Sequence, residues 1–211
     1  MKVSCLQENL SRGLAIVGRA VASRATLPIT QNVLLSTDKS MLKLSATNLE
    51  IAMTTWVGGK VEEEGAITVP ARLLSELVGS LPREEIELEL QPGTGVLKLT
   101  CARAKANIHG ADAADFPPIP TVEEGISAQI DPQVLKLAIA RVAFAAATEE
   151  SRPVLTGVEV KLEGDKFSMA AADGFRLAVQ HGPLVKRVDQ ETTVIVPART
   201  LNELSRLLGD Q

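Results

Sequence analysis

Strict alternation of apolar and polar residues marks several short segments of the chain as half-buried strands. The clearest is Glu85-Ile86-Glu87-Leu88-Glu89-Leu90, and a second alternating run at residues 96–100 follows the turn-forming Pro92-Gly93-Thr94-Gly95. Successive side chains of a strand point to opposite faces, so the pattern puts one face on a core and the other in water. The same reasoning predicts further strands at residues 32–37, 41–46, 49–57, 60–69 and 102–109.

Apolar residues at helical spacing predict a first helix over residues 8–22. Its core-facing stripe consists of Leu10, Leu14, Val17 and Val21. Arg12 and Arg19 project from the opposite face, and small residues fill the sides of the helix. A helix of this kind can lie close to another surface.

Proline favours the first position of a helix, which predicts that Pro70 and Pro132 begin two more helices. Asp131 stands directly before Pro132 and is expected to cap that helix. Together with a segment near the end of the sequence, this predicts helices at residues 71–79, 132–147 and 198–208.

The chain carries the same sequence pattern twice. The segment Leu27-Pro28-Ile29 returns around Pro153, 125 positions after Pro28. The segment Thr68-Val69-Pro70-Ala71-Arg72 returns as Ile195-Val196-Pro197-Ala198-Arg199, 127 positions later. A period this long indicates a duplicated domain and not a solenoid, whose repeats span about 20–50 residues.

The duplication predicts an α+β protein of two domains. The expected boundaries are residues 1–119 for the first domain, 120–126 for a linker and 127–211 for the second domain. The second copy lacks a counterpart of the segment from Glu85 to Ile119. We therefore expect it to expose a sheet edge and part of its core face.

Composition narrows the function classes. Hydrophobic residues make up 45% of the chain but aromatic residues only 2%, so the cores must be aliphatic. The sequence opens without a signal peptide and contains two cysteines in apolar contexts, Cys5 and Cys101, which favours a reduced, cytoplasmic protein without a membrane span. A net charge of −4 excludes DNA binding by bulk charge but not by a segregated basic face.

No constellation of catalytic residues is present in the sequence. The two histidines, His109 and His181, have no metal-ligand spacing to a cysteine, a histidine or a carboxylate. Phosphate-binding loops, nucleophile elbows and zinc-protease motifs are absent as well. We therefore expect a binding or scaffold protein that is not an enzyme and uses no cofactor or metal.

Four segments, in order along the chain, resemble the bacterial DNA polymerase III beta subunit, the sliding clamp family. They are Leu27-Pro28-Ile29, Thr68-Val69-Pro70-Ala71-Arg72, Asp115-Phe116-Pro117 and Ala172-Asp173-Gly174-Phe175-Arg176-Leu177-Ala178. The resemblance implies three such domains per subunit and a homodimer ring of six, with helices lining the hole and antiparallel sheets on the outer rim. Double-stranded DNA passes through without sequence readout, and the ring tethers the replicative polymerase. Asn48 departs from the family's Thr-Asp-Leu-Glu motif.

The resemblance also implies binding sites. A ring that slides needs a diffuse positive lining. Arg12 and Arg19 are candidates for this lining, because the helix pattern places them opposite the core-facing stripe. Family positions match the DNA-contacting residues Arg12, Arg24, Arg72, Arg152 and Arg199; of these, Arg72 and Arg199 have the alternative role of pairing with nearby acids at a helix start. A pocket for a short peptide from the polymerase alpha subunit, the clamp loader and other clamp-binding-motif proteins matches Leu155, Gly174, Phe175, Arg176 and Leu177. Ring closure implicates Arg103 and Lys105.

Two other readings stay open from the sequence. One is a two-domain interaction module that has the clamp fold but forms no ring, and it differs from a clamp in its assembly. The other is an enzyme with an unrecognised site, which a titratable group with a shifted pKa in a cleft would favour. For the peptide pocket, the alternative is that Asp173-Gly174 is a plain turn with Phe175 in the core.

Overall fold

The structure is a computed structural model that describes residues 1–22, 27–91, 93–121, 125–149 and 151–208. The chain divides into two compact units, Met1–Pro120 and Thr121–Gln211. Each unit combines antiparallel sheet with two α-helices, so the predicted α+β class is confirmed.

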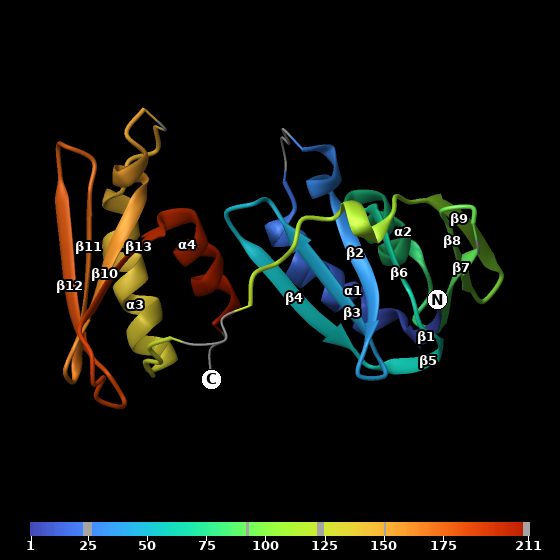
Figure 1. The fold of residues 1–211 in the computed structure, drawn as a ribbon, viewed down its shortest axis with the longest axis horizontal. Helices are drawn as coiled ribbons and strands as arrows, with labels where there is room; N and C mark the ends of the chain where they lie inside the picture. Colours follow the sequence, from blue (N-terminus) through green and yellow to red (C-terminus); the bar gives the residue numbers. More distant parts are fainter. Residues whose placement is uncertain (23–26, 92, 122–124, 150, 209–211) are drawn as a thin grey trace. The chain divides into compact units, whose positions relative to one another are not determined.

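Unit 1 contains two antiparallel sheets and two helices (Figure 1). One sheet has the order β5-β1-β7-β8-β9 and the other the order β4-β3-β2-β6. The strands are β1 (Lys2–Leu6), β2 (Asn32–Asp38), β3 (Met41–Thr47), β4 (Ala52–Val57), β5 (Gly59–Glu63), β6 (Ala66–Pro70), β7 (Glu85–Gln91), β8 (Val96–Cys101) and β9 (Ala104–His109). The helices are α1 (Gln7–Val17) and α2 (Ala71–Ser80).

Unit 2 repeats one half of this plan. Its sheet has the order β12-β11-β10-β13, which matches β4-β3-β2-β6 strand for strand. The strands are β10 (Gly157–Glu163), β11 (Lys166–Ala172), β12 (Leu177–Pro183) and β13 (Thr192–Pro197). Helices α3 (Pro132–Val142) and α4 (Ala198–Leu207) contact each other and this sheet.

The apolar stripes of the sequence form the two cores. In unit 1, Leu10 and Leu14 of α1 are buried with Leu44 of β3 and Leu74 of α2. In unit 2, Ile139 of α3 is buried with Phe167 and other residues of the sheet. Both cores contain few aromatic side chains, as the composition requires.

A short bridge joins the two sheets of unit 1. Ala111, just beyond β9, pairs with Thr68 of β6, with Thr68 N donating to Ala111 O at 3.1 Å and Ala111 N to Thr68 O at 2.9 Å. Gly110 precedes this contact, and a Cβ there would lie 2.3 Å from the Thr68 carbonyl oxygen. The strand can approach this closely only because residue 110 is a glycine.

Several predicted element ends were wrong. The strand expected from residue 49 begins at Ala52, because the Asn48 side chain accepts hydrogen bonds from Glu50 N and Ile51 N and turns the chain. An aspartate would form the same turn. The run at residues 60–69 divides into β5 and β6.

The helix predictions need corrections too. The first helix ends at Val17 and continues as a 3-10 turn, Gly18–Ala20. Pro70 is the last residue of β6 and the N-cap of α2 and not its first helical residue, so α2 begins at Ala71, as the range 71–79 predicted, and ends one residue later, at Ser80. The start of α3 is confirmed, since Asp131 Oδ1 accepts from Gln133 N at 2.9 Å and from Val134 N at 3.1 Å.

Candidate nucleic-acid and peptide interfaces

Basic residues outnumber acidic residues on the helices of unit 2. The whole chain has 22 basic and 26 acidic residues, whereas the four α-helices carry six basic and three acidic ones. The basic six are Arg12, Arg72, Lys136, Arg141, Arg199 and Arg206. The excess lies on α3 and α4, which carry four basic residues and one acidic residue, whereas α1 and α2 each carry one residue of each sign. In unit 2 the helices therefore form a net positive region in a net negative chain, as polyanion binding requires.

In unit 1, α1 and α2 border an open groove of about 590 Å³. Small side chains such as Ser11 and Ala15 form part of its lining, with Arg12 and Arg83 at the same groove. Arg83, which follows α2, pairs with Glu8 at 3.2 Å. The sequence patterns did not nominate Arg83, because it lies outside any helical stripe.

Arg72 lies on the exposed side of α2 and donates from Nε to Glu76 Oε1 at 2.7 Å. The carboxylate raises the pKa of Arg72 through this hydrogen bond and through its charge. The structure thus shows the acidic partner that was the alternative for Arg72. Both side chains are mostly exposed, so the ion pair leaves the guanidinium open to solvent.

In unit 2, Arg199 is exposed on the first turn of α4 and has no ion-pair partner among the described residues. Arg206, two turns further on, pairs with Glu203. Arg141 of α3 donates instead to Gln180 on the edge strand β12, at 3.3 Å. Among these arginines, Arg141 and Arg206 are therefore bonded to a neighbouring side chain, whereas Arg199 is not ion-paired with any other described residue.

The remaining DNA-binding candidates lie elsewhere. Arg19 is exposed on the 3-10 turn after α1. Arg24 lies outside the described residues, so its predicted role remains a prediction. Arg152 is exposed at the start of a 3-10 turn, Pro153–Thr156, beside the Gly174 turn and not on a helix.

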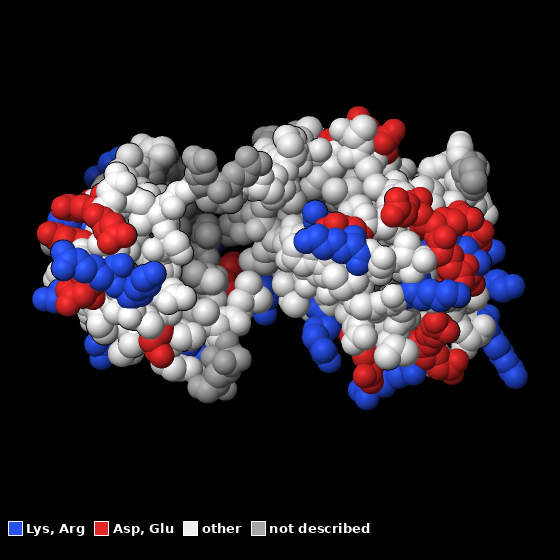
Figure 2. Space-filling model, turned by 60° about the horizontal axis from the view of Figure 1, so that its bottom comes forward, with Lys and Arg blue, Asp and Glu red and all other residues white. Residues whose placement is uncertain are grey.

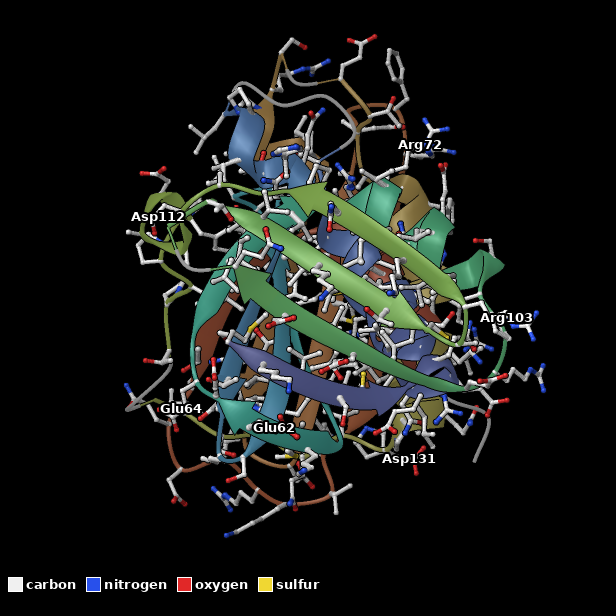
Figure 3. All side chains as sticks on the ribbon, turned by 90° about the vertical axis from the view of Figure 1, so that its right-hand side faces the viewer. Glu62, Glu64, Arg72, Arg103, Asp112 and Asp131 are labelled. Atoms are coloured by element: carbon white, nitrogen blue, oxygen red, sulfur yellow. The ribbon has the colours of Figure 1, made fainter. Side chains whose placement is uncertain are left out.

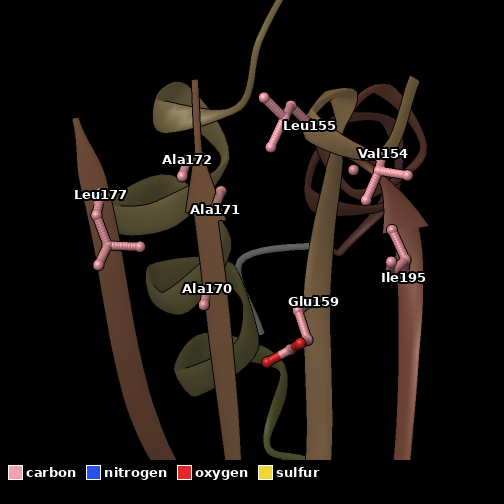
Figure 4. Close-up of a pocket in the computed structure, with 9 residues that line it drawn as sticks. Val154, Leu155, Glu159, Ala170, Ala171, Ala172, Leu177 and Ile195 are labelled. Atoms are coloured by element: carbon pink, nitrogen blue, oxygen red, sulfur yellow. The ribbon is translucent and has the colours of Figure 1, made fainter. Parts of the chain in front are cut away.

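An open apolar pocket of about 220 Å³ lies on the sheet of unit 2 (Figure 4). Leu155 and Leu177, two of the predicted pocket residues, line it together with Val154, Ile195 and a floor of alanines on β11. The floor and walls share one sheet face, because Glu159 is paired with Ala170 on one side and Ile195 on the other. Sequence reasoning missed Val154, although it directly precedes Leu155, and Ile195, which only the register of β10 and β13 brings to this pocket.

The predicted residues Phe175 and Arg176 line a second, polar pocket of about 160 Å³, which Arg152 also lines. Phe175 is 95% exposed, so the alternative that it belongs to the core is wrong. Gly174 has a φ of +93° and forms the turn that holds Phe175 outward. Of the five predicted residues, Leu155 and Leu177 therefore line the apolar pocket and Phe175 and Arg176 the polar one, while Gly174 forms the turn between β11 and β12.

Arg176 is held in place from two sides. Its Nε donates to Asp173 Oδ2 at 2.8 Å, and its guanidinium lies 5.6 Å from the centre of the Phe144 ring. Backbone hydrogen bonds from Phe175 and Arg176 lower the pKa of Asp173, with a further contribution from the Arg176 side chain. The carboxylate stays charged and fixes the arginine at the pocket.

The predicted ring-interface residues lie at an open sheet edge. β9 is the last strand of its sheet, and both Arg103, in the β8–β9 turn, and Lys105 are exposed (Figure 3). Edge strands present unpaired backbone groups that pair readily with another strand. This edge is geometrically suited to sheet extension by a further chain.

The sheet surface of unit 1 is dominated by ion pairs. Lys2 lies 2.8 Å from Glu62 and 3.3 Å from Glu87, and Lys60 lies 2.9 Å from Glu62. Hydrogen bonds from the two lysines lower the pKa of Glu62 to about 2. Acidic and basic side chains accordingly lie intermixed on the face of unit 1 drawn in Figure 2.

The described residues contain no group of three or more histidine, cysteine or acidic side chains placed to hold a metal ion. Within the same residues, no helix has the length and apolarity needed to cross a membrane. Cys5 and Cys101 are both buried free thiols, and burial raises the pKa of Cys5 to about 12.

Comparisons with known proteins match the whole arrangement. Family models for the DNA polymerase III beta subunit match residues 1–120 with the N-terminal domain and residues 129–211 with the central domain. The beta sliding clamp of Synechocystis is 38% identical over 230 residues, covering 100% of this chain and 59% of the relative. That of Bacillus subtilis is 31% identical, covering 100% of this chain and 57% of the relative.

Solved structures give the same result. The DNA polymerase sliding clamp from Bacillus subtilis superposes with a TM-score of 0.95 at 30% identity, and the DNA polymerase III subunit beta from Pseudomonas aeruginosa with 0.92 at 30%. Each match covers 100% of this chain and 57% of the solved chain. The duplicated fold thus defines a protein of the sliding-clamp class.

The chain belongs to the DNA polymerase III beta subunit family. It spans somewhat less than three fifths of the length of the relatives that it matches.

Proposed function

We propose that this protein is a sliding clamp that encircles duplex DNA and tethers the replicative polymerase. The observation that carries the proposal is the excess of basic residues on the helices of unit 2, four against one acidic residue, in a net negative chain. The helices of unit 1 carry two residues of each sign and present the exposed side chains of Arg12 and Arg72. Phosphate contacts by lysine and arginine release counterions and carry no sequence information. Helices of this kind hold DNA of any sequence without fixing its position.

On this proposal the protein is a non-catalytic accessory factor of the cytoplasm, without a cofactor. Arg12, Arg19, Arg72 and Arg199 are the DNA-facing residues among those described, and Arg24 remains a candidate on the resemblance alone. Arg152 is the weakest of the proposed DNA contacts, because it lines the same pocket as Phe175 and Arg176.

The apolar pocket is the proposed docking site for a peptide of the polymerase alpha subunit, the clamp loader and other partners. Leu155 and Leu177 would receive the apolar end of the peptide. Arg176, fixed by Asp173, stands beside this pocket and would take a polar or acidic group that precedes the apolar end. In the family that the chain resembles, a third domain supplies the opposite wall.

The open edge of β9 is the proposed ring contact. A strand of a second subunit would extend the sheet there, with Arg103 and Lys105 meeting acidic groups. This accounts for the exposed basic side chains of Arg103, in the turn before β9, and Lys105, on β9 itself.

The DNA part of the proposal is tested by salt dependence. Binding of a fluorescent 30-base-pair duplex is measured by anisotropy over a sodium chloride series, for the wild-type protein and for Arg12→Gln. Each lost phosphate contact flattens the slope of log affinity against log salt by about 0.9. The matched control is Lys39→Gln, which removes the same charge from the β2–β3 turn. An equal change for both variants would contradict a helical DNA face.

The peptide part is tested with Leu177→Ala and a short fluorescent peptide that ends in two large apolar residues. The substitution removes about three carbon atoms from the pocket wall, which at about 0.8 kcal/mol per buried methylene weakens binding by up to about 50-fold. The control is Leu137→Ala, an exposed leucine of α3 in the same unit. Unchanged affinity for Leu177→Ala would place the peptide elsewhere.

A further inference from the structure

Arginines on or beside the helices of both units are held by glutamates. Arg72 pairs with Glu76 on α2, Arg206 pairs with Glu203 on α4, and Arg83 after α2 pairs with Glu8 of α1. A face that binds phosphate by charge alone would gain affinity without these acids. Their presence beside the arginines therefore needs an explanation of its own.

The arrangement on α2 recurs on α4. Arg72 and Glu76 stand 127 positions before Arg199 and Glu203, the same offset that separates Pro70 from Pro197. Both glutamates therefore occupy one position of the duplicated helix, four residues after an arginine. On α4 the acid pairs with Arg206 one turn further on, so the acid is common to both copies while its partner differs.

The chemistry of the Arg72–Glu76 pair allows the arginine to exchange its carboxylate partner for a phosphate. Carboxylate and phosphate oxygens compete for the same planar guanidinium donors, and an arginine bonds either in a similar geometry. The Arg72 side chain is 91% exposed and that of Glu76 64% exposed, and exposed ion pairs are weak. A phosphate can thus displace the glutamate, and the glutamate can displace the phosphate, with little change in the number of hydrogen bonds.

We propose that Glu76 is a built-in competitor of DNA phosphate, which takes back Arg72 each time a phosphate moves away; the Glu203 side chain at the matching position of α4 is only 14% exposed and is not part of the proposal. The inference rests on the proposed function. A clamp that slides must break and remake its phosphate contacts at every step along the duplex. An acid poised beside the arginine lowers the lifetime of each contact, so the protein stays on DNA by its topology and not by local adhesion.

The test uses Glu76→Gln in the whole protein, with the 30-base-pair duplex as the probe. Glutamine keeps the size of the side chain but is a poor competitor for a guanidinium. We expect duplex affinity to rise about two- to fivefold, since the exposed pair is weak. The salt slope steepens by up to about 0.9, the value of one further phosphate contact. Stopped-flow dissociation of the duplex slows by the same factor as the affinity rises.

A double-mutant cycle separates competition from bulk charge. In an Arg72→Gln background, Glu76→Gln should no longer raise affinity, because the arginine for which it competes is gone. The matched control is Glu64→Gln, which removes one acid from the turn after β5 and should leave affinity unchanged. An equal gain from Glu76→Gln with and without Arg72, or no gain at all, would overturn the inference.

Failure of the proposed function has a different signature. A wild-type protein that shows no salt-dependent binding of duplex DNA would contradict the clamp proposal itself, and the competitor role would fall with it. A protein that binds duplex with the expected salt slope, but is indifferent to Glu76→Gln, would contradict only the competitor role.

Discussion

Gly110→Ala tests how the two sheets of unit 1 are joined. A Cβ at residue 110 would lie 2.3 Å from the Thr68 carbonyl oxygen and 2.7 Å from Ile67 Cδ1. The backbone must move apart, which weakens the two hydrogen bonds between Thr68 and Ala111. Two lost bonds of about 0.5–1.5 kcal/mol each, with overpacking of about 1–3 kcal/mol, predict a destabilisation of at least about 2 kcal/mol.

Trp56, the single tryptophan of the chain, lies in unit 1, so its fluorescence reports on the unfolding of this unit. In urea, with a slope of about 2 kcal/mol per molar, Gly110→Ala should lower the midpoint by about 1 M.

Gly79→Ala is the matched control. Its Cβ would meet no atom within 4 Å in α2, and alanine is the better helix former by about 1 kcal/mol. The control should therefore raise the midpoint slightly. A midpoint for Gly110→Ala at or above that of the wild type would refute the account of the bridge.

Three further predictions concern acid stability, thiol reactivity and the second core. Glu62 has its pKa lowered to about 2 by Lys2 and Lys60, so it contributes stability above its ordinary pKa of 4.5 that is lost as pH falls towards 2. In Glu62→Gln the urea midpoint should decrease less between pH 4.5 and pH 2 than it does in the wild type. An equal decrease in both proteins would contradict the ion pairs of Glu62 with Lys2 and Lys60. The buried thiol of Cys5, with its pKa raised to about 12, should resist Ellman's reagent at pH 8 until the protein is denatured, and rapid native labelling would contradict its burial. Phe167→Ala, at a side chain 1% exposed, should destabilise unit 2 by about 3–5 kcal/mol, measured as a lower melting temperature by circular dichroism. A change below about 1 kcal/mol would contradict the central place of Phe167 in that core.

Many of the helices and strands could be predicted from the spacing of apolar residues along the sequence. The alternating run of β7 and the Asp131 cap of α3 are local patterns, so the sequence alone located both elements. The duplication predicted two related domains, and the structure shows that they share one sheet order. Element ends failed where a side chain competes with the ladder, as Asn48 does before β4.

The sites were less accessible, because they depend on contacts between distant residues. Leu155 and Leu177 were predicted from a family motif, but only the register of β10 and β13 brings Ile195 beside them. The pairing of Arg83 with Glu8 spans 75 positions and leaves no local pattern. The Arg72–Glu76 pair, four residues apart on a helix, was foreseen as an alternative because helical spacing alone brings the two side chains together.

The most direct test of the central claim is topological. The protein is incubated with a bacterial clamp loader, ATP and a nicked circular plasmid, and its retention on DNA is followed by gel filtration in high salt before and after the plasmid is cut once. Encirclement predicts that the protein stays on the circle and leaves the linear molecule through its ends. Equal retention on both forms, or release from both by salt alone, would contradict a sliding clamp.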